Sequence, residues 1–201
     1  ISKVILQRPI NLDQIQYNQS QHCLFMTIAS LTEVKGISLI INALSRIDQD
    51  HLQKIKWVII GDGPLYSKLI KDIKSANLQN QLFLVGKKED VFSWLKQCNI
   101  YVNTSMWEGC PYSILEAMAA EKPIIAADVP GCRDLIESGE TGVLFNRDNL
   151  EDLISLIKSA IHEADIWLEY ASKAAQKVRS SYSATTMQNH TQNLYKKIIE
   201  K

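Results

Sequence analysis

Short apolar runs alternate with helical segments along most of this chain. The runs are rich in β-branched residues, have the length of strands, and lie at 23–29, 55–61, 81–86, 99–104, 122–128 and 141–145. Helical patterns fill the intervals, at 36–47, 64–77, 89–97, 111–120 and 131–138. This alternation predicts right-handed βαβ units that share one parallel sheet. Because the strands are continuously apolar, helices are expected to cover both faces of that sheet.

The predicted fold is therefore α/β, a Rossmann-like doubly wound parallel sheet of about six strands with a C-terminal helical tail. From Leu150 onward the apolar periodicity indicates three helices, in which Trp167 and Tyr195 have the character of packing residues. Residues 1–21 are polar and patternless, and the chain begins with Ile1. We expect a fragment of a longer chain, with a lead-in over 1–21, a ligand-binding domain over 22–163 and a helical tail over 164–201.

Composition excludes several classes of function. The net charge is zero, so bulk charge does not favour nucleic acid or an anionic membrane. The four cysteines form no CxxC pair and have no histidine at metal-ligand spacing, which is typical of small core thiols in a reducing compartment. No apolar run approaches the roughly 20 residues that a membrane helix needs, and no signal peptide is recognisable.

Ligands of a doubly wound sheet bind beyond the carboxyl ends of its strands, so the loops that follow the strands are the candidate sites. The first of these loops ends in Lys35 and Gly36, and the second reads Gly61-Asp62-Gly63-Pro64. The glycines of the second loop also suit a tight turn, so its contact with a ligand and a purely structural role both stay open. Gly86, after the third strand, is a candidate for contact with a base.

The loop after the fourth strand leads into a helix that we expect to begin at Pro111. A helix N-terminus offers unpaired amides and partial positive charge, which favour phosphate. With proline in the first position, the amides of Tyr112 and Ser113 remain free to donate. Together with the Lys35 ammonium they could hold a diphosphate without a metal.

Two carboxylates flank this helix start, at Glu108 in the loop and Glu116 inside an otherwise apolar helix. They could be an acid/base pair, two hydrogen-bond acceptors for one ligand, or surface residues. Glu116 is about 7 Å from the phosphate end at 1.5 Å per residue, so it suits ribose hydroxyls better than phosphate. Glu108 suits hydroxyls at the other end of the ligand. Sugar, diphosphate and nucleoside in that order describe a nucleotide-sugar.

These motifs together resemble the C-terminal half of a GT-B fold glycosyltransferase of the large retaining family 4, over residues 24 to about 162. The matching elements are KG at 35–36, GDGP at 61–64, S-x-x-EG-x-P at 105–111, E-x7-E at 108–116, LEAMA at 115–119, KPIIA at 122–126 and SGETGVLF at 138–145. In that family this half binds the nucleotide-sugar donor and a separate N-terminal half binds the acceptor.

The resemblance implies that Glu108 contacts the donor sugar and Glu116 the ribose, and we place Lys35 at the diphosphate. The predicted catalytic residues are Lys35 and Glu108, and the predicted donor-binding residues are Ser30, Gly61, Asp62, Gly86, Gly109, Cys110, Pro111, Tyr112, Ser113 and Glu116. Where the family has Gly-Arg before the KG, this sequence reads Ala29-Ser30. Lys35 and the helix amides could suffice, another residue could substitute for the arginine, or donor binding could be weaker.

The expected function is donor binding for retaining transfer of a hexose from a UDP- or GDP-linked sugar, in polysaccharide or lipopolysaccharide synthesis, without metal or other cofactor. The fragment alone is expected to turn over poorly, because its acceptor, a sugar or a lipid-linked group, would bind to the missing domain. A nucleotide-sugar epimerase and a non-catalytic binding domain are the alternatives. The resemblance places the whole protein in the cytoplasm, with peripheral association at the inner face of the membrane.

Two other features resemble functional motifs but are not assigned a role. Asp48-Gln49-Asp50 spells the DxD of metal-dependent glycosyltransferases of another fold. It is expected to end a helix at the wrong side of the sheet, as a solvated helix end. The four histidines lie outside the strand-end loops and provide no convincing catalytic base.

Overall fold

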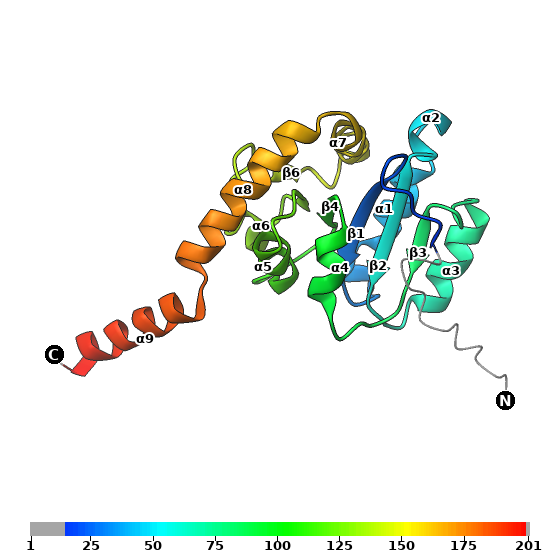
Figure 1. Ribbon diagram of the computed structural model, residues 1–201. Helices are drawn as coiled ribbons and strands as arrows, with labels where there is room; N and C mark the ends of the chain where they lie inside the picture. The colour runs from blue at the N-terminus through cyan, green and yellow to red at the C-terminus, as the bar shows by residue number, and fades with distance from the viewer. Residues whose placement is uncertain (1–14, 200–201) are drawn as a thin grey trace.

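Six parallel strands form the centre of the molecule (Figure 1). The computed structural model describes residues 15–199, without the side chains at 184, 190, 194, 197 and 199. The strands are β1 (Cys23–Ile28), β2 (Ile55–Ile60), β3 (Leu82–Leu84), β4 (Ile100–Asn103), β5 (Ile124–Ala127) and β6 (Val143–Phe145). Their order across the sheet is β3-β2-β1-β4-β5-β6, and every neighbouring pair is parallel. The order reverses between β1 and β4, which makes that junction the topological switch point.

Helices cover both faces of the sheet, as continuously apolar strands require. They are η2 (Glu33–Lys35), α1 (Ile37–Leu44), α2 (Gln49–Leu52), α3 (Tyr66–Ser75), α4 (Val91–Gln97), α5 (Tyr112–Ala119), α6 (Pro130–Arg133), α7 (Leu150–His162), α8 (Ala164–Ser181) and α9 (Ala184–Ile199). Helix α1 contacts α3 and α7 in one layer, while α5 contacts α4 and α8 in the other. The predicted fold class is thus confirmed.

The core lies along β1 and β2, where most residues are buried. All six residues of β2 are buried, and the Trp57 ring stacks on Phe25 with 5.0 Å between ring centroids. The indole N–H of Trp57 donates to the Thr27 hydroxyl at 3.1 Å, and that hydroxyl donates to the Val102 carbonyl at 2.8 Å. The buried polar groups of Trp57 and Thr27 are thereby paired, and the chain of bonds fixes β1 between β2 and β4.

Several predicted boundaries were wrong by one to three residues, for local reasons. β3 ends before Gly86, whose φ of 73° turns the chain out of the strand. Pro64 lies before the cap of α3 rather than in its first turn, and Pro111 is the N-cap of α5. Asp48 does not end a helix: it caps α2 by accepting from the His51 amide, and it pairs with Lys158 at 2.8 Å.

The three helices predicted from Leu150 onward are present as α7, α8 and α9, and the last two, which form the tail, differ in how they pack. Helix α8 lies on α5 and β5, and it buries Trp167 to 2% exposure. Helix α9 contacts α8 and extends away from the sheet (Figure 1). Tyr195 on α9 is 62% exposed, so its predicted packing role was wrong.

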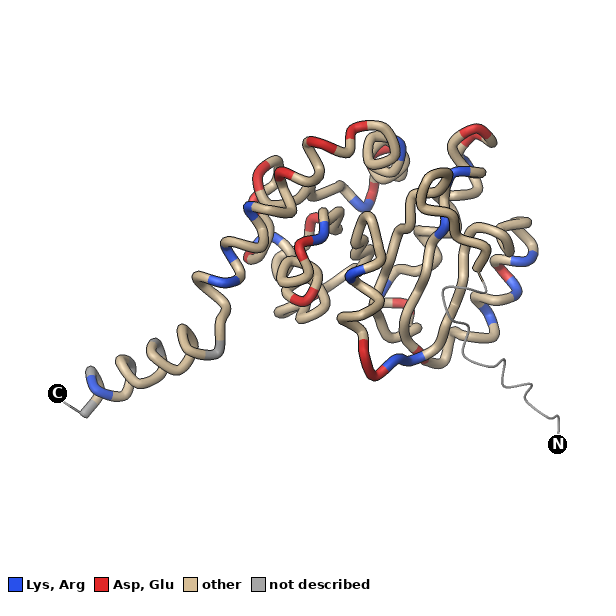
Figure 2. Tube along the Cα trace, viewed as in Figure 1, with Lys and Arg blue, Asp and Glu red and all other residues tan. Residues whose placement is uncertain are grey.

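At the other end of the chain, residues 1–14 of the expected lead-in lie outside the described residues. Ile15 is buried in the core, and the Tyr17 hydroxyl donates to Asn99 at 3.1 Å. Charged residues of both signs lie along α3, α7 and α8, and in α8 the acidic residues lie near its start and the basic residues near its end (Figure 2). No helix within residues 15–199 is both long and apolar enough to cross a membrane.

Candidate functional site

The switch point brings together the two residues predicted to be catalytic. Lys35 follows β1 through η2, and Glu108 lies in the loop after β4, the neighbouring strand. The Lys35 ammonium donates to Glu108 Oε1 at 2.8 Å, and the side chains are 26% and 10% exposed. Residues 73 positions apart in the chain thus form an ion pair at the edge where such sheets bind ligands.

The Glu108 carboxylate is held by more than its lysine. Its Oε1 atom also accepts from the Ser105 hydroxyl at 2.6 Å and from the Asn103 side-chain amide at 3.3 Å. Burial by itself would raise the pKa of Glu108, but the hydrogen bonds from Lys35, Ser105 and Asn103 outweigh it and lower that pKa. The carboxylate is therefore a charged hydrogen-bond acceptor and is poorly suited to the role of general acid.

Backbone contacts lock the β1 and β4 loops to each other. The Thr104 hydroxyl donates to the Lys35 carbonyl at 3.0 Å, and the Met106 amide donates to the Val34 carbonyl at 2.7 Å. Gly36 has a φ of 65°, and a Cβ there would lie 2.2 Å from the Thr104 carbonyl oxygen. Glycine is required at this point because the loops approach so closely.

The N-terminus of α5 points to the same edge of the sheet. Its first residue, Tyr112, is 75% exposed, and Ser113 is half-buried. Pro111 caps the helix with its carbonyl, which accepts from the Ile114 amide at 2.9 Å. Among the described residues, the amides of Tyr112 and Ser113 donate to no backbone carbonyl. They are the free donors that an anion at this helix end would use.

Two more predicted residues, Gly109 and Cys110, lie in the loop between Glu108 and α5, and both are exposed. Glu116 lies more than one turn into α5 and is exposed as well. Partial burial by neighbouring atoms raises the pKa of Glu116, and within residues 15–199 its carboxylate makes no hydrogen bond or ion pair. It is available to a ligand hydroxyl.

A second group of predicted residues surrounds the ends of β2 and β3. Gly61 donates its amide to the Gly86 carbonyl at 3.0 Å, so that amide is already used. A Cβ on Gly61 would lie 1.8 Å from the Ala29 carbonyl oxygen, which gives this glycine a structural role. Asp62 and Ser30 are exposed beside it, with the Asp62 carboxylate accepting from the Gly63 amide. Among the described residues, no hydrogen bond or ion pair joins this group to Glu108.

The sequence reading missed four residues that shape the site. Asn103 and Ser105 are buried partners of Glu108, and Gly131 of α6 supports the loop from below. Arg147, after β6, donates from Nε to the Thr104 carbonyl at 3.1 Å. Its terminal nitrogen is 3.2 Å from the position of a Cβ on Gly36. All four lie at or after the end of a strand, and Ser105 also stands in the S-x-x-EG-x-P motif, but neither signal distinguishes these residues from others in the same loops.

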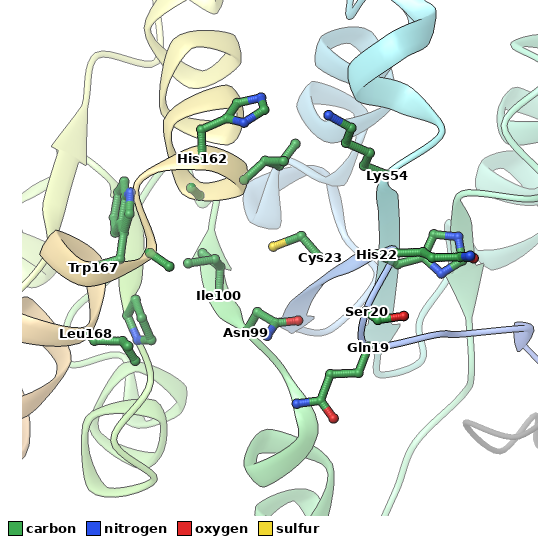
Figure 3. Close-up of a pocket in the computed structure, with 15 residues that line it drawn as sticks. Gln19, Ser20, His22, Cys23, Lys54, Asn99, Ile100, His162, Trp167 and Leu168 are labelled. Carbon is green, nitrogen blue, oxygen red and sulfur yellow. The ribbon is translucent and has the colours of Figure 1, made fainter.

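A cavity of about 420 Å³ lies at the other end of the strands from this site, near the starts of β1 and β4 (Figure 3). Its polar groups are largely satisfied: Asn99 Oδ1 accepts from the Leu24 amide and the Tyr17 hydroxyl, and the Trp167 indole donates to Ser159. Burial raises the pKa of the Cys23 thiol to about 12, so it is a poor nucleophile. The carboxyl-end site is the better candidate.

The carboxyl-end site can bind an anion next to a group of hydroxyls. Lys35 and the α5 amides supply positive charge and donors, while Glu108, before α5, and Glu116, within it, supply acceptors. Across the described part of the chain, His, Cys, Asp and Glu form no group of three or more that could hold a metal ion. Fold and site together define a Rossmann-like domain of the type that binds nucleotides at its switch point.

Comparison with known proteins gives the family. The family described as glycosyl transferases group 1 matches residues 12–180. This protein belongs to that family. Its Rossmann-like fold matches less than half of each of two solved GT-B structures, which are described next.

Similar sequences include glycosyltransferases of bacteria and archaea. An uncharacterized glycosyltransferase of Methanocaldococcus jannaschii is 37% identical over 130 residues, which are 65% of this chain and 30% of that protein. The poly(ribitol-phosphate) alpha-N-acetylglucosaminyltransferase of Staphylococcus aureus is 28% identical over 169 residues, 84% of this chain and 34% of that protein. The chain thus spans about a third of the length of these relatives.

Solved structures agree with this assignment. A mutant of S. aureus TarM, solved in complex with fondaparinux, alpha-GlcNAc-glycerol and UDP, has a TM-score of 0.80 at 27% identity, over 87% of this chain and 36% of that one. Anabaena HepE, solved in complex with UDP and glucose, has a TM-score of 0.79 at 22% identity, over 88% and 49%. The HepE likeness is one of fold.

Proposed function

We propose that this chain binds the nucleotide-sugar donor of a retaining family 4 hexosyltransferase. The observation that carries the proposal is the Lys35–Glu108 pair at the switch point, next to the unpaired amides of α5, in a chain of the group 1 family. The pair offers a cation for phosphate and a carboxylate for hydroxyls. The two groups are joined by a hydrogen bond. The α5 amides extend the anion-binding surface by a further set of donors.

The chemistry of such a site is electrostatic. When the bond between the sugar and the diphosphate breaks, negative charge accumulates on the leaving diphosphate. Lys35 and the amides of Tyr112 and Ser113 stabilise this charge from fixed positions. The carboxylate of Glu108 donates no proton, because its hydrogen bonds lower its pKa. Neither a metal nor an acid/base pair is needed on the donor side in this scheme.

Each carboxylate then has a place along one extended ligand. Glu108 accepts hydrogen bonds from hydroxyls of the donor sugar, on the β4 side of the diphosphate. Glu116, more than a turn into α5, accepts from the ribose hydroxyls of the nucleoside. Its exposed carboxylate is free for that contact. The two residues act as acceptors at the two ends of the diphosphate rather than as an acid and a base.

Uracil is the base that we propose. The support is the UDP bound to TarM, which is 27% identical to this chain and shares its fold. The names of the relatives also favour cell-surface or secreted polysaccharide as the class of product, since the S. aureus relative acts on poly(ribitol-phosphate). For the whole protein we propose a sugar or lipid-linked acceptor bound outside this chain, and a cytoplasmic location at the membrane face.

Arg147 is our candidate for the positive charge that Ser30 does not supply. Its guanidinium lies at the start of α1, within 3.2 Å of the position of a Cβ on Gly36, the residue that follows Lys35. Among the described residues it forms no ion pair with a carboxylate. We propose that its long-range charge favours the diphosphate beside Lys35.

Calorimetric titration of this 201-residue chain with UDP, GDP, ADP and their sugars tests the proposal. We expect binding of UDP and of a UDP-sugar. Lys35→Ala and Glu116→Ala should each weaken UDP binding about tenfold or more, since each removes one charged hydrogen bond to the ligand. A matched control is Lys122→Ala, which removes a lysine that donates to the Lys96 carbonyl away from this site.

The control should leave UDP affinity unchanged. Failure of the unaltered chain to bind any of the nucleotides at millimolar concentration would contradict donor binding. Equal losses of UDP affinity in the control and in the site variants would show that the effect does not depend on the position of the removed charge. Transfer to acceptors is expected to be poor with this chain alone, and rapid transfer would contradict the proposed placement of the acceptor outside it.

A further inference from the structure

Lys35 has two partners in this site, one present and one proposed. In the structure its ammonium lies 2.8 Å from Glu108 Oε1, and that carboxylate neutralises much of its charge. A donor diphosphate needs the same positive charge, and it is repelled by an ionised carboxylate only a few ångströms from the lysine. The diphosphate and Glu108 therefore compete for Lys35.

Glu108 would not be left unpaired if Lys35 turned to a diphosphate. The Ser105 hydroxyl at 2.6 Å and the Asn103 amide at 3.3 Å bind the same oxygen, Oε1. Both residues are buried, Ser105 to 1% and Asn103 to 4% exposure. The Asn103 side-chain oxygen also accepts from the Ser105 amide at 3.0 Å, which fixes the two relative to each other. Such neutral donors can hold a carboxylate that has lost its counter-ion.

We infer that Asn103 and Ser105 are positioning residues that hold the Glu108 carboxylate in place while Lys35 moves from Glu108 to the donor diphosphate. The inference rests on the proposed donor site. It also gives the order of events in that site: the Lys35–Glu108 ion pair is closed before the donor binds, and the diphosphate then breaks it. We call this ion pair the latch. The opened latch leaves Glu108 pointing at the sugar with Oε2 available, because the three bonds described all end on Oε1.

The latch separates the binding of a nucleotide from the binding of a nucleotide-sugar. UDP alone has to part Lys35 from Glu108 and gives Glu108 nothing in return. A UDP-sugar offers hydroxyls that Glu108 can accept. The preference for UDP-sugar over UDP, measured as a ratio of dissociation constants, therefore reports on Glu108 and on the residues that hold it.

Glu108→Gln tests the competition directly, because it keeps the shape of the side chain and removes its charge. We expect UDP to bind about three- to tenfold more tightly to this variant than to the unaltered chain. In a Lys35→Ala background, the part of this gain that comes from competition for the lysine should be lost. Asp128→Asn is the matched control: it removes one charge after β5, from a carboxylate paired with Arg133, and should leave UDP binding unchanged.

The positioning role is tested by Ser105→Ala and Asn103→Ala, with thermal unfolding as a check that each is folded. UDP affinity should stay within about twofold while the preference for UDP-sugar falls about fivefold. Loss of a hydrogen bond to the ionised carboxylate raises the pKa of Glu108, so the acid limb of this preference should shift to higher pH. Ser105→Thr, which keeps the hydroxyl, should restore both.

The outcomes separate the inference from the proposed function. Unchanged or weaker UDP binding by Glu108→Gln overturns the latch and leaves donor binding standing, provided the unaltered chain binds UDP. No UDP binding by the unaltered chain overturns both. If Ser105→Ala and Asn103→Ala lose UDP and UDP-sugar affinity equally, with no shift in the acid limb, the two residues are structural and the positioning role fails.

Discussion

The four cysteines differ in environment, and one of them lies beside the candidate site. Cys98 and Cys132 are buried and Cys23 is half-buried, as expected for core thiols, and burial raises the pKa of each to about 12. Cys110 is exposed in the loop between Glu108 and α5. A single thiol is therefore placed to report on the occupancy of this loop.

We expect Cys110 to react much faster than the other thiols with an alkylating reagent at neutral pH, because reaction requires access and some thiolate. A saturating UDP-sugar should slow the labelling of Cys110, since the ligand would lie over this loop. Mass spectrometry of the labelled peptides measures both rates. Cys110→Ser should remove the fast phase. Labelling that is indifferent to the UDP-sugar would argue that Cys110 is not at the donor site.

At the scale of single residues, the sequence identified the charged residues of the site better than it identified the residues that bind them. Lys35 and Glu108 were recognised from motifs and from their position after strands. Their ion pair was not predicted, because it joins residues 73 positions apart through a fold that sets their distance. Asn103 and Ser105 were missed because buried neutral side chains carry no pattern that distinguishes a hydrogen-bond partner from ordinary packing.

Among the elements, α6 supports the loop that carries Glu108. A Cβ on Gly131 would lie 2.5 Å from the carbonyl oxygens of both Glu108 and Gly109, closer than real contacts allow. Gly131→Ala should therefore push this loop away from the helix. We expect a loss of about 1–3 kcal/mol in the free energy of unfolding, as for other overpacked sites. Denaturant unfolding measures it.

The same variant should bind UDP-sugar less tightly, because the displaced loop moves Glu108. Gly109→Ala provides the stability control, since a Cβ at Gly109 meets nothing within 4 Å and should change the free energy of unfolding by less than about 0.5 kcal/mol. A Gly131→Ala variant as stable as this control would mean that the loop moves aside without a loss in the free energy of unfolding.

The elements themselves were largely predictable, because strand and helix periods are local properties of the sequence. All six strands and the three helices from Leu150 onward were found, with errors at their ends, whereas the short helix α2 was missed. Pro64 and Pro111 were placed inside helices, but both precede the first helical residue. The order of the strands required tertiary contacts, and only that order shows that β1 and β4 are neighbours.

For the whole molecule, the two last helices make unequal contributions. Helix α8 buries Trp167, Ala171 and Ala174 and lies on α5 and β5, so it belongs to the core of the fold. Helix α9 contacts α8 and leaves Met187 and Ile198 68% and 61% exposed. Periodicity alone predicts both helices equally well, because it does not reveal whether a partner covers the apolar face.

Truncation after Ser183 should therefore leave the domain intact. We expect the free energy of unfolding to change by less than about 1 kcal/mol, because the apolar side chains of α9 that the structure describes, Met187, Tyr195 and Ile198, are mostly exposed. Affinity for UDP should be unchanged, since α9 lies far from the switch point (Figure 1). Denaturant unfolding and calorimetry measure the two quantities on the same preparation.

A second truncation, after Glu163, is the contrasting variant. It also removes α8, together with the ion pairs from Lys177 to Glu137 and from Arg179 to Glu121. Losing the buried Trp167 side chain alone should cost about 3–5 kcal/mol, which is a large part of the stability of an ordinary domain. Equal stability losses in the two truncations would show that α9 carries as much of the fold as α8, against the burial pattern of the two helices.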